Sequence, residues 1–136
     1  MFKSFLRVVE LQGLQAAGKT TLTKAWLDRF PNVVRVNRDD LRAMLRGNAY
    51  TRGHEPVVVA CEKACAEAAI REGYNVIVDD TNLTGDPLWK RLADALDVKY
   101  TSRRLNVSVE EAIQRDAQRP KPVGPVVIKA TAKRMK

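Results

Sequence analysis

Cysteine and histidine are scarce in this sequence of 136 residues, which has two cysteines and one histidine. Cys61 and Cys65 lie four residues apart in a predicted helix, so they share one face but are held too rigidly to form a disulfide. A metal site built on the two thiols would need two further ligands, and His54 could supply only one. We therefore expect no disulfide scaffold and no thiolate metal site, and we predict that both cysteines are buried as small apolar side chains.

Long apolar runs are also lacking, because none approaches the roughly 20 residues that cross a bilayer. The first five residues lead straight into a predicted strand, without the apolar core or cleavage site of a signal peptide. We therefore expect a cytoplasmic protein with no membrane partner.

Repeats, low-complexity segments and long linkers are absent as well, and 45% of the residues are apolar. Such a chain is long enough to bury a core of its own and has no compositional sign of disorder. The sequence therefore predicts a single domain over residues 1–136.

Positive charge exceeds negative charge by 8, and the excess is uneven. Residues 1–100 carry 15 Lys and Arg against 13 Asp and Glu, whereas residues 101–136 carry 9 against 3. A basic C-terminal third favours a polyanionic partner such as a nucleic acid, although some of this charge could serve a nucleotide or be ordinary solvated surface.

Strand-like and helix-like segments alternate along the chain. Strands are predicted at Leu6–Leu11, Val33–Val36, Val76–Val78 and Val98–Leu105. Helices are predicted at Lys19–Arg29, from a cap at Asp39 or Asp40 to Arg46, at Val57–Glu72, Asp86–Leu96, after Ser108, and at Pro125–Lys136. Strands separated by helices predict an α/β fold of the P-loop NTPase type, a parallel sheet with helices on both faces.

The first strand is followed by Gly13-Leu14-Gln15-Ala16-Ala17-Gly18-Lys19-Thr20, a full match to the P-loop pattern G-x-x-x-x-G-K-[ST]. Its glycines allow successive backbone N–H groups to point at phosphate oxygens, and the helix that follows presents its free N–H groups to anions. Lys19 is expected to contact the β- and γ-phosphates of ATP, and the Thr20 hydroxyl is expected to ligate Mg²⁺.

Charged residues follow the next two strands, at the edge of the sheet where ligands gather. Phosphoryl transfer to a hydroxyl needs a carboxylate to accept its proton, and Asp39 is favoured over Asp40 for this role. Arg42 lies three residues further on and could hold a phosphate of the acceptor. Of the two carboxylates after the third strand, Asp80 is favoured over Asp79 for the metal site.

Arg115 and Arg119 lie four residues apart in the helix after Ser108, which ends at the prolines that follow. This arrangement predicts a helical lid over about residues 108–124 whose arginines close over the triphosphate, although a solvated basic face would look the same.

Together these motifs resemble the 5′-hydroxyl polynucleotide kinase domain of phage end-healing enzymes. The shared features are the P-loop at 13–20, N-R-D-D-x-R at 37–42, D-T-N-L at 80–83, R-x-x-x-R at 115–119 and P-V-G-P-V-V-I at 122–128. They occur in this order over nearly the whole chain. The second and third are the most distinctive.

The resemblance implies an ATP-dependent kinase, or one using another NTP, that phosphorylates 5′-OH ends of RNA or DNA with Mg²⁺ or Mn²⁺. Asp39 resembles the general base, Arg42 the acceptor-phosphate ligand, and Lys19 and Arg119 the phosphate clamps, assisted by Arg115. Thr20 and Asp80 resemble the metal-site residues. ATP contacts are expected from Gly13, Gln15, Ala16, Ala17, Gly18, Lys19, Thr20, Thr21, Arg115 and Arg119. Acceptor contacts are expected from Arg38, Asp39, Arg42, Thr81 and Asn82.

The resemblance also implies a phage-encoded protein that acts in a bacterial host. Because residues 1–136 match the kinase region alone, a ligase or 3′-phosphatase is expected to act in trans. The sequence indicates no oligomeric state.

Two other functions fit part of the pattern. A P-loop kinase for a nucleoside or sugar would share the P-loop, the base and the lid, but it would not need the basic C-terminal third. A nucleotide-binding switch would keep Lys19 and Thr20, but it would not need Asp39 together with two lid arginines.

Overall fold

The computed structural model describes residues 5–47, 50–80 and 87–135, and its centre is a parallel sheet of four strands. The strands are β1 (Arg7–Gln12), β2 (Val33–Val36), β3 (Asn75–Asp79) and β4 (Lys99–Arg104), in the spatial order β2-β3-β1-β4. In the register, Val8 of β1 lies beside Val76 on one side and Tyr100 on the other. The predicted parallel sheet is therefore confirmed.

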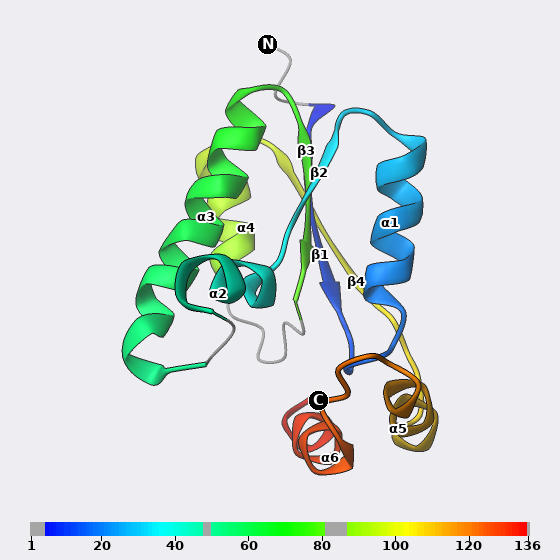
Figure 1. Cartoon of the computed structure of the whole chain (residues 1–136). Helices are drawn as coiled ribbons and strands as arrows, with labels where there is room; N and C mark the ends of the chain where they lie inside the picture. Colours follow the sequence, from blue (N-terminus) through cyan, green and yellow to red (C-terminus); the bar gives the residue numbers. More distant parts are fainter. Residues whose placement is uncertain (1–4, 48–49, 81–86, 136) are drawn as a thin grey trace.

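Helices cover both faces of this sheet (Figure 1). The helix α1 (Lys19–Arg29) lies on one face, and α3 (Glu55–Arg71) and α4 (Leu88–Ala95) lie on the other. The short helix α2 (Arg38–Arg46) and the 3-10 turn η2 (Arg52–His54) connect β2 to α3. The last two helices, α5 (Val109–Ala117) and α6 (Pro125–Arg134), lie beyond the carboxyl ends of the strands.

The main core lies between the sheet and the helices α3 and α4. It contains Val8, Val76 and Val78 from the strands, with Ile70 and Trp89 from the helices. The inner strand β3 carries a buried apolar run, Val76–Val78, because both faces of the sheet are covered there, whereas the edge strand β4 is polar and mostly exposed. Trp89 is only 2% exposed and is thus a core residue, whereas Trp26 on α1 is half-buried under the guanidinium of Arg103.

Two sequence-based expectations differ from the structure, and a third lies outside the described residues. Neither Asp39 nor Asp40 caps α2 with its side chain, because the helix begins earlier and the side chain of Asn37 accepts the backbone N–H of Asp40. Cys61 is half-buried and Cys65 is exposed, because the buried stripe of α3 runs through Val58, Glu62 and Ala66 instead. The predicted start of α4 at Asp86 lies outside the described residues.

Within the part of the chain that is described, no helix is both long and apolar enough to cross a membrane.

Candidate active site

The loop between β1 and α1 makes a tight cradle at the carboxyl edge of the sheet. A side chain at Gly13 would meet the carbonyl oxygen of Leu105 at 3.0 Å and the Cβ of Ala17 at 3.2 Å, so only glycine fits there. Gly18 has a φ of 102° and forms the N-cap of α1 with left-handed backbone that glycine adopts without strain. The loop therefore delivers the N-terminus of α1, and Lys19 at its start, to the edge of the sheet.

Lys19 is folded back onto this loop. Its Nζ donates hydrogen bonds of 2.8 Å to the carbonyl oxygens of Gly13 and Leu14, and the residue is 8% exposed. Burial lowers the pKa of the ammonium to about 8; the charge of Asp79 opposes this shift, and that of Arg119 adds to it. A desolvated cation that has only neutral partners within bonding distance is well suited to receive phosphate oxygens.

Asp79, at the end of β3, joins the P-loop to β2. Its Oδ2 accepts a hydrogen bond of 3.3 Å from the Thr20 hydroxyl and one of 2.8 Å from Nε of Arg35. Burial raises the pKa of this 2% exposed carboxyl, and the cations of Arg35 and Lys19 oppose the rise. We predicted Asp80 for the metal site, but the structure places Asp79 beside Thr20. Consecutive residues of a strand point to opposite faces, and the face of Asp79 is the one that carries α1.

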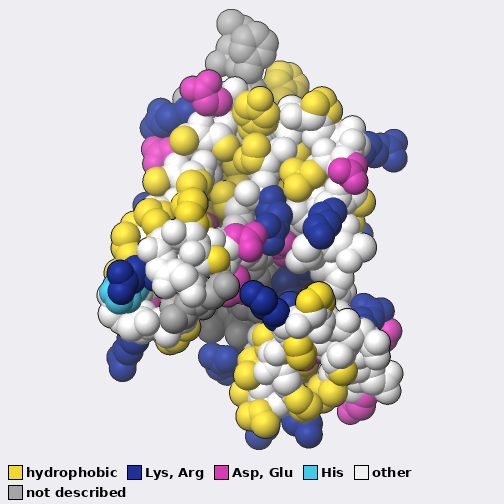
Figure 2. Space-filling model, viewed as in Figure 1, with side chains coloured by type: hydrophobic (Ala, Val, Ile, Leu, Met, Phe, Trp, Pro, Cys, Tyr) yellow, Lys and Arg dark blue, Asp and Glu magenta, His cyan; other side chains and the backbone are white. Residues whose placement is uncertain are grey.

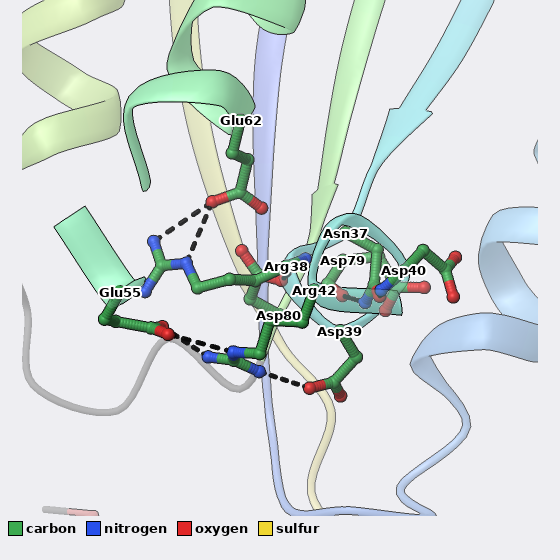
Figure 3. A network of polar contacts seen from close by, with 9 residues as sticks. All are labelled: Asn37, Arg38, Asp39, Asp40, Arg42, Glu55, Glu62, Asp79 and Asp80. Atoms are coloured by element: carbon green, nitrogen blue, oxygen red, sulfur yellow. Dashed lines mark hydrogen bonds and ion pairs between the residues drawn. The ribbon is translucent and has the colours of Figure 1, made fainter. Parts of the chain in front are cut away.

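Arg42 lies between two carboxylates, Asp39 and Glu55, near the start of α2 (Figure 3). Its Nε donates to Oε2 of Glu55 at 3.0 Å, one Nη donates to the other Glu55 oxygen, and the second Nη donates to Asp39. The Arg42 side chain is 17% exposed, whereas that of Asp39 is 84% exposed. The guanidinium is thus fixed in place while the Asp39 carboxylate remains open to an incoming molecule.

A buried cluster lies behind this pair, where α3 meets the end of β3. Arg38 pairs with Glu62 at 3.0 Å, and its backbone N–H donates to Oδ1 of Asp80 at 2.8 Å. Glu62 is fully buried, and its Oε2 accepts no hydrogen bond from any described donor. Burial, together with the hydrogen bond and charge of Asp80, raises the pKa of Glu62 to about 9. Glu62 therefore holds a proton at neutral pH.

The helices α5 and α6 border the site beyond the carboxyl ends of the strands. Leu14 of the P-loop packs with Ala112 and Ile128 of the two helices, and Gln15 donates a hydrogen bond of 3.1 Å to the Thr131 hydroxyl. Figure 2 shows charged side chains of both signs around a hollow between these helices and the rest of the molecule.

Of the two arginines expected in the lid, only Arg119 lies near the P-loop in the structure. Its charge acts on Lys19, and its Nη donates to Asp116 at 3.2 Å. Arg115 instead pairs with Glu111 on the exposed side of α5. Asp116 is 1% exposed and accepts the backbone N–H groups of Val123 and Gly124, so it holds the turn between α5 and α6.

Known proteins share both the sequence pattern and this fold. The family model described as AAA domain matches residues 8–136. This chain belongs to that family.

A viral relative of this AAA domain, from Autographa californica nuclear polyhedrosis virus, is named as a bifunctional polynucleotide kinase/RNA ligase. It is 28% identical over 147 residues, an alignment that covers 94% of this chain and 20% of the relative. The chain thus spans about a fifth of the length of that protein.

Two solved structures share the fold of the AAA domain. A chain in the structure of the Pnkp1/Rnl/Hen1 RNA repair complex superposes with a TM-score of 0.79 at 22% identity, covering 97% of this chain and 44% of that one. The APS kinase CysC of Mycobacterium tuberculosis, with AMPPNP and APS bound, superposes with a TM-score of 0.67 at 14% identity, covering 85% of this chain and 70% of that one. These likenesses establish a P-loop kinase-like fold.

The AAA domain thus brings Lys19, Thr20, Asp39 and Arg42 to one edge of its sheet, as their positions after strands predict. Arg119 was predicted within the lid helix but follows its end, because α5 stops at Ala117. Thr21 is exposed at the start of α1, and Thr81 and Asn82 lie outside the described residues. Glu55, Glu62, Asp79 and Asp116 contribute to the site although the sequence analysis did not select them. Asp79 carried a signal as one of the two carboxylates after the third strand. Glu62 and Asp116 carried a weaker one, because they are acids on the otherwise apolar stripes of their helices.

The pKa of Lys19 should couple nucleotide binding to pH. Phosphates favour the charged ammonium and should raise its pKa above 8, so ATP binding at pH 9 should take up a proton. We expect the dissociation constant of ATP to rise by up to about tenfold between pH 8 and pH 9. The phosphates of ATP titrate below this pH range, so they do not contribute to the rise. Calorimetry in two buffers of different ionisation heat measures the proton. Lys19→Met should abolish the uptake, and an absence of uptake in the unmodified protein would contradict the burial argument.

The proton on Glu62 should make stability depend on pH. A carboxyl whose pKa is higher in the folded state stabilises fully at low pH, and this contribution is lost as pH rises toward 9. We expect the free energy of unfolding to fall between pH 6 and pH 8.5, by at most about 1.4 kcal/mol per pH unit.

Glu62→Gln keeps an oxygen that accepts from Arg38 and an N–H that can donate to Asp80, but it has no titratable proton. It should therefore reduce the dependence of the free energy of unfolding on pH. Urea denaturation across this pH range measures the change. Glu67→Gln, on the same helix in an exposed pair with Arg71, should keep the unmodified slope. Equal slopes in all three proteins would show that Glu62 is ionised.

Proposed function

We propose that this domain is a polynucleotide 5′-hydroxyl kinase that transfers the γ-phosphoryl group of ATP to 5′-OH ends in RNA repair. The observation that carries the proposal is the pairing of an open carboxylate, Asp39, with a fixed guanidinium, Arg42, close enough to the P-loop that the charge of Asp39 acts on Lys19. The names of the relatives support the same activity.

On the donor side, the P-loop backbone and Lys19 hold the β- and γ-phosphates. Thr20 and Asp79 supply an adjacent hydroxyl and carboxylate, 3.3 Å apart, and such hard oxygen donors fit Mg²⁺. When bound, Mg²⁺ neutralises charge on the phosphates. Arg119, whose side chain is 43% exposed, turns from Asp116 toward the γ-phosphate and stabilises the charge of the transition state.

On the acceptor side, Asp39 accepts the proton of the 5′-hydroxyl as the hydroxyl oxygen bonds to the γ-phosphorus. The bond from the γ-phosphorus to the β–γ bridging oxygen breaks, and ADP leaves. Arg42 has five N–H donors, and the described carboxylates of Asp39 and Glu55 use three of them. The other two bind the phosphate that follows the first nucleoside. Because Glu55 fixes the guanidinium, the acceptor is placed against Asp39 at little entropic cost.

A separate ligase completes the repair in this proposal. The viral relative is named for kinase and RNA ligase activities together, and the solved complex is named for Pnkp1, Rnl and Hen1. A phosphorylated 5′ end is the product that a ligase consumes, so the kinase would act before it.

The fold likeness to APS kinase supports a second candidate, a kinase for a small hydroxylated acceptor. It would keep the donor side unchanged, since both classes use the same P-loop. The two candidates differ in Arg42, because a nucleoside without a 3′-phosphate gives it nothing to bind.

The proposal is tested with γ-labelled ATP, Mg²⁺ and 5′-OH oligonucleotides of RNA and of DNA. Label should appear on the 5′ end, faster than on the corresponding free nucleoside, because only the oligonucleotide carries the phosphate for Arg42. Faster labelling of the nucleoside would favour the small-molecule kinase. ATP hydrolysis without acceptor and without labelled product would indicate a nucleotide switch.

Asp39→Asn should lower kcat for the oligonucleotide by about 10²–10⁴, the usual contribution of a general base. The dissociation constant of ATP should change less than twofold, since Asp39 acts on the acceptor. Asp94→Asn, an exposed carboxylate paired with Lys90 on α4, serves as a control with full activity. If Asp40→Asn lost activity and Asp39→Asn did not, the base would be Asp40.

A further inference from the structure

Tyr50 presents an aromatic ring at the surface beside the acceptor side of the site. The residue is 65% exposed, and its ring centre lies 5.4 Å from the guanidinium carbon of Arg42. Figure 3 shows the side chain of Arg42 running between Glu55 and Asp39. The ring therefore rests on the cation that contacts the open carboxylate.

A cation–π contact alone would not single out Tyr50. Phe30 also lies near an arginine, with the guanidinium carbon of Arg29 5.6 Å from its ring centre. That pair consists of neighbouring residues at the C-terminal end of α1, away from the P-loop. What distinguishes Tyr50 is its partner, because Arg42 belongs to the site.

The guanidinium of Arg42, which the Tyr50 ring contacts, is held in a fixed orientation. Three hydrogen bonds to Asp39 and Glu55 fix the plane of the Arg42 guanidinium, and the pKa of Arg42 is raised by its hydrogen bonds to Glu55, against the opposing effect of burial. An aromatic ring stacked on a fixed cation loses little further freedom when a second flat group binds to it.

The order of the three groups matches the order of groups in a nucleic-acid strand. In the proposed function, Asp39 receives the 5′-hydroxyl of the first nucleoside and Arg42 receives the phosphate that follows. Tyr50 lies against the guanidinium of Arg42, so its ring is next to the place proposed for that phosphate, from which the strand continues into the second nucleotide. The flat, apolar part of that nucleotide is its base.

We propose that Tyr50 is a stacking platform for the nucleobase of the second nucleotide of the acceptor. Stacking on an aromatic ring accepts every base, because each base has a π-face, and it therefore suits an enzyme that acts on ends of any sequence. This inference rests on the proposed function, since it requires a polynucleotide acceptor.

The test compares three 5′-OH oligonucleotides of one sequence: intact, without a base at the second nucleotide, and without a base at the first. With the intact strand, Tyr50→Ala should raise KM about tenfold, which is about 1.4 kcal/mol and typical of base–aromatic stacking. The values of kcat and of KM for ATP should stay within twofold. Tyr50→Phe should behave as the unmodified protein.

The strand without the second base isolates stacking from any support that Tyr50 gives to Arg42. On this acceptor, Tyr50→Ala and the unmodified protein should have the same KM, whereas the strand without the first base should still show the tenfold difference. A loss of equal size on all three strands, or one that disappears only without the first base, would overturn the assignment.

Tyr74→Ala is a matched control, because Tyr74 is an exposed tyrosine in the turn before β3, at the opposite end of the sheet. It should leave all three KM values unchanged. If the unmodified protein labels none of the strands, the proposed function itself fails. If it labels the intact strand and Tyr50→Ala has no effect there, only the stacking platform is wrong.

Discussion

The end of β3 is the constraint on which the site depends. On the face of the sheet that carries α1, the Asp79 carboxylate accepts hydrogen bonds from the side chains of Arg35 and Thr20. Its backbone carbonyl accepts a hydrogen bond from the side chain of Asn37. Asp80, the next residue, accepts the backbone N–H of Arg38 from the other side. Two consecutive residues thus fix the P-loop helix and the start of α2 relative to one strand, which sets the distance between Lys19 and Asp39.

Charge balance explains how so many ionisable groups fit at this edge. A buried, unpaired charge would cost several kcal/mol, so each buried acid needs a cation or a proton. Asp79 forms an ion pair with Arg35 and lies near the charge of Lys19. Glu62 contacts the guanidinium of Arg38, whose backbone N–H bonds to Asp80, and Glu62 keeps a proton. The proton on Glu62 therefore reduces the negative charge that is buried behind the site, whereas the Asp39 carboxylate is exposed to solvent.

The sequence predicted the parts of this arrangement that are local and missed those that depend on packing. The P-loop motif and the alternation of strands and helices place Lys19, Asp39 and Arg42 at one edge of the sheet, because the carboxyl ends of parallel strands meet at the same edge. The choice between Asp79 and Asp80 depends on which face of β3 carries α1, and this follows only from the fold. Glu55 and Glu62 come from α3, far along the chain, so no spacing links them to the arginines that they hold.

The position of α5 and α6 is determined mainly by the P-loop rather than by the sheet. Leu14 lies in the core of the helix pair, and uncovering it would cost roughly 2 kcal/mol of apolar burial. Gln15 adds a hydrogen bond to Thr131, and Asp116 ties the turn between the helices to α5. Because these contacts come from the P-loop, a change in the conformation of that loop would be transmitted to α5 and to Arg119, which follows the end of that helix.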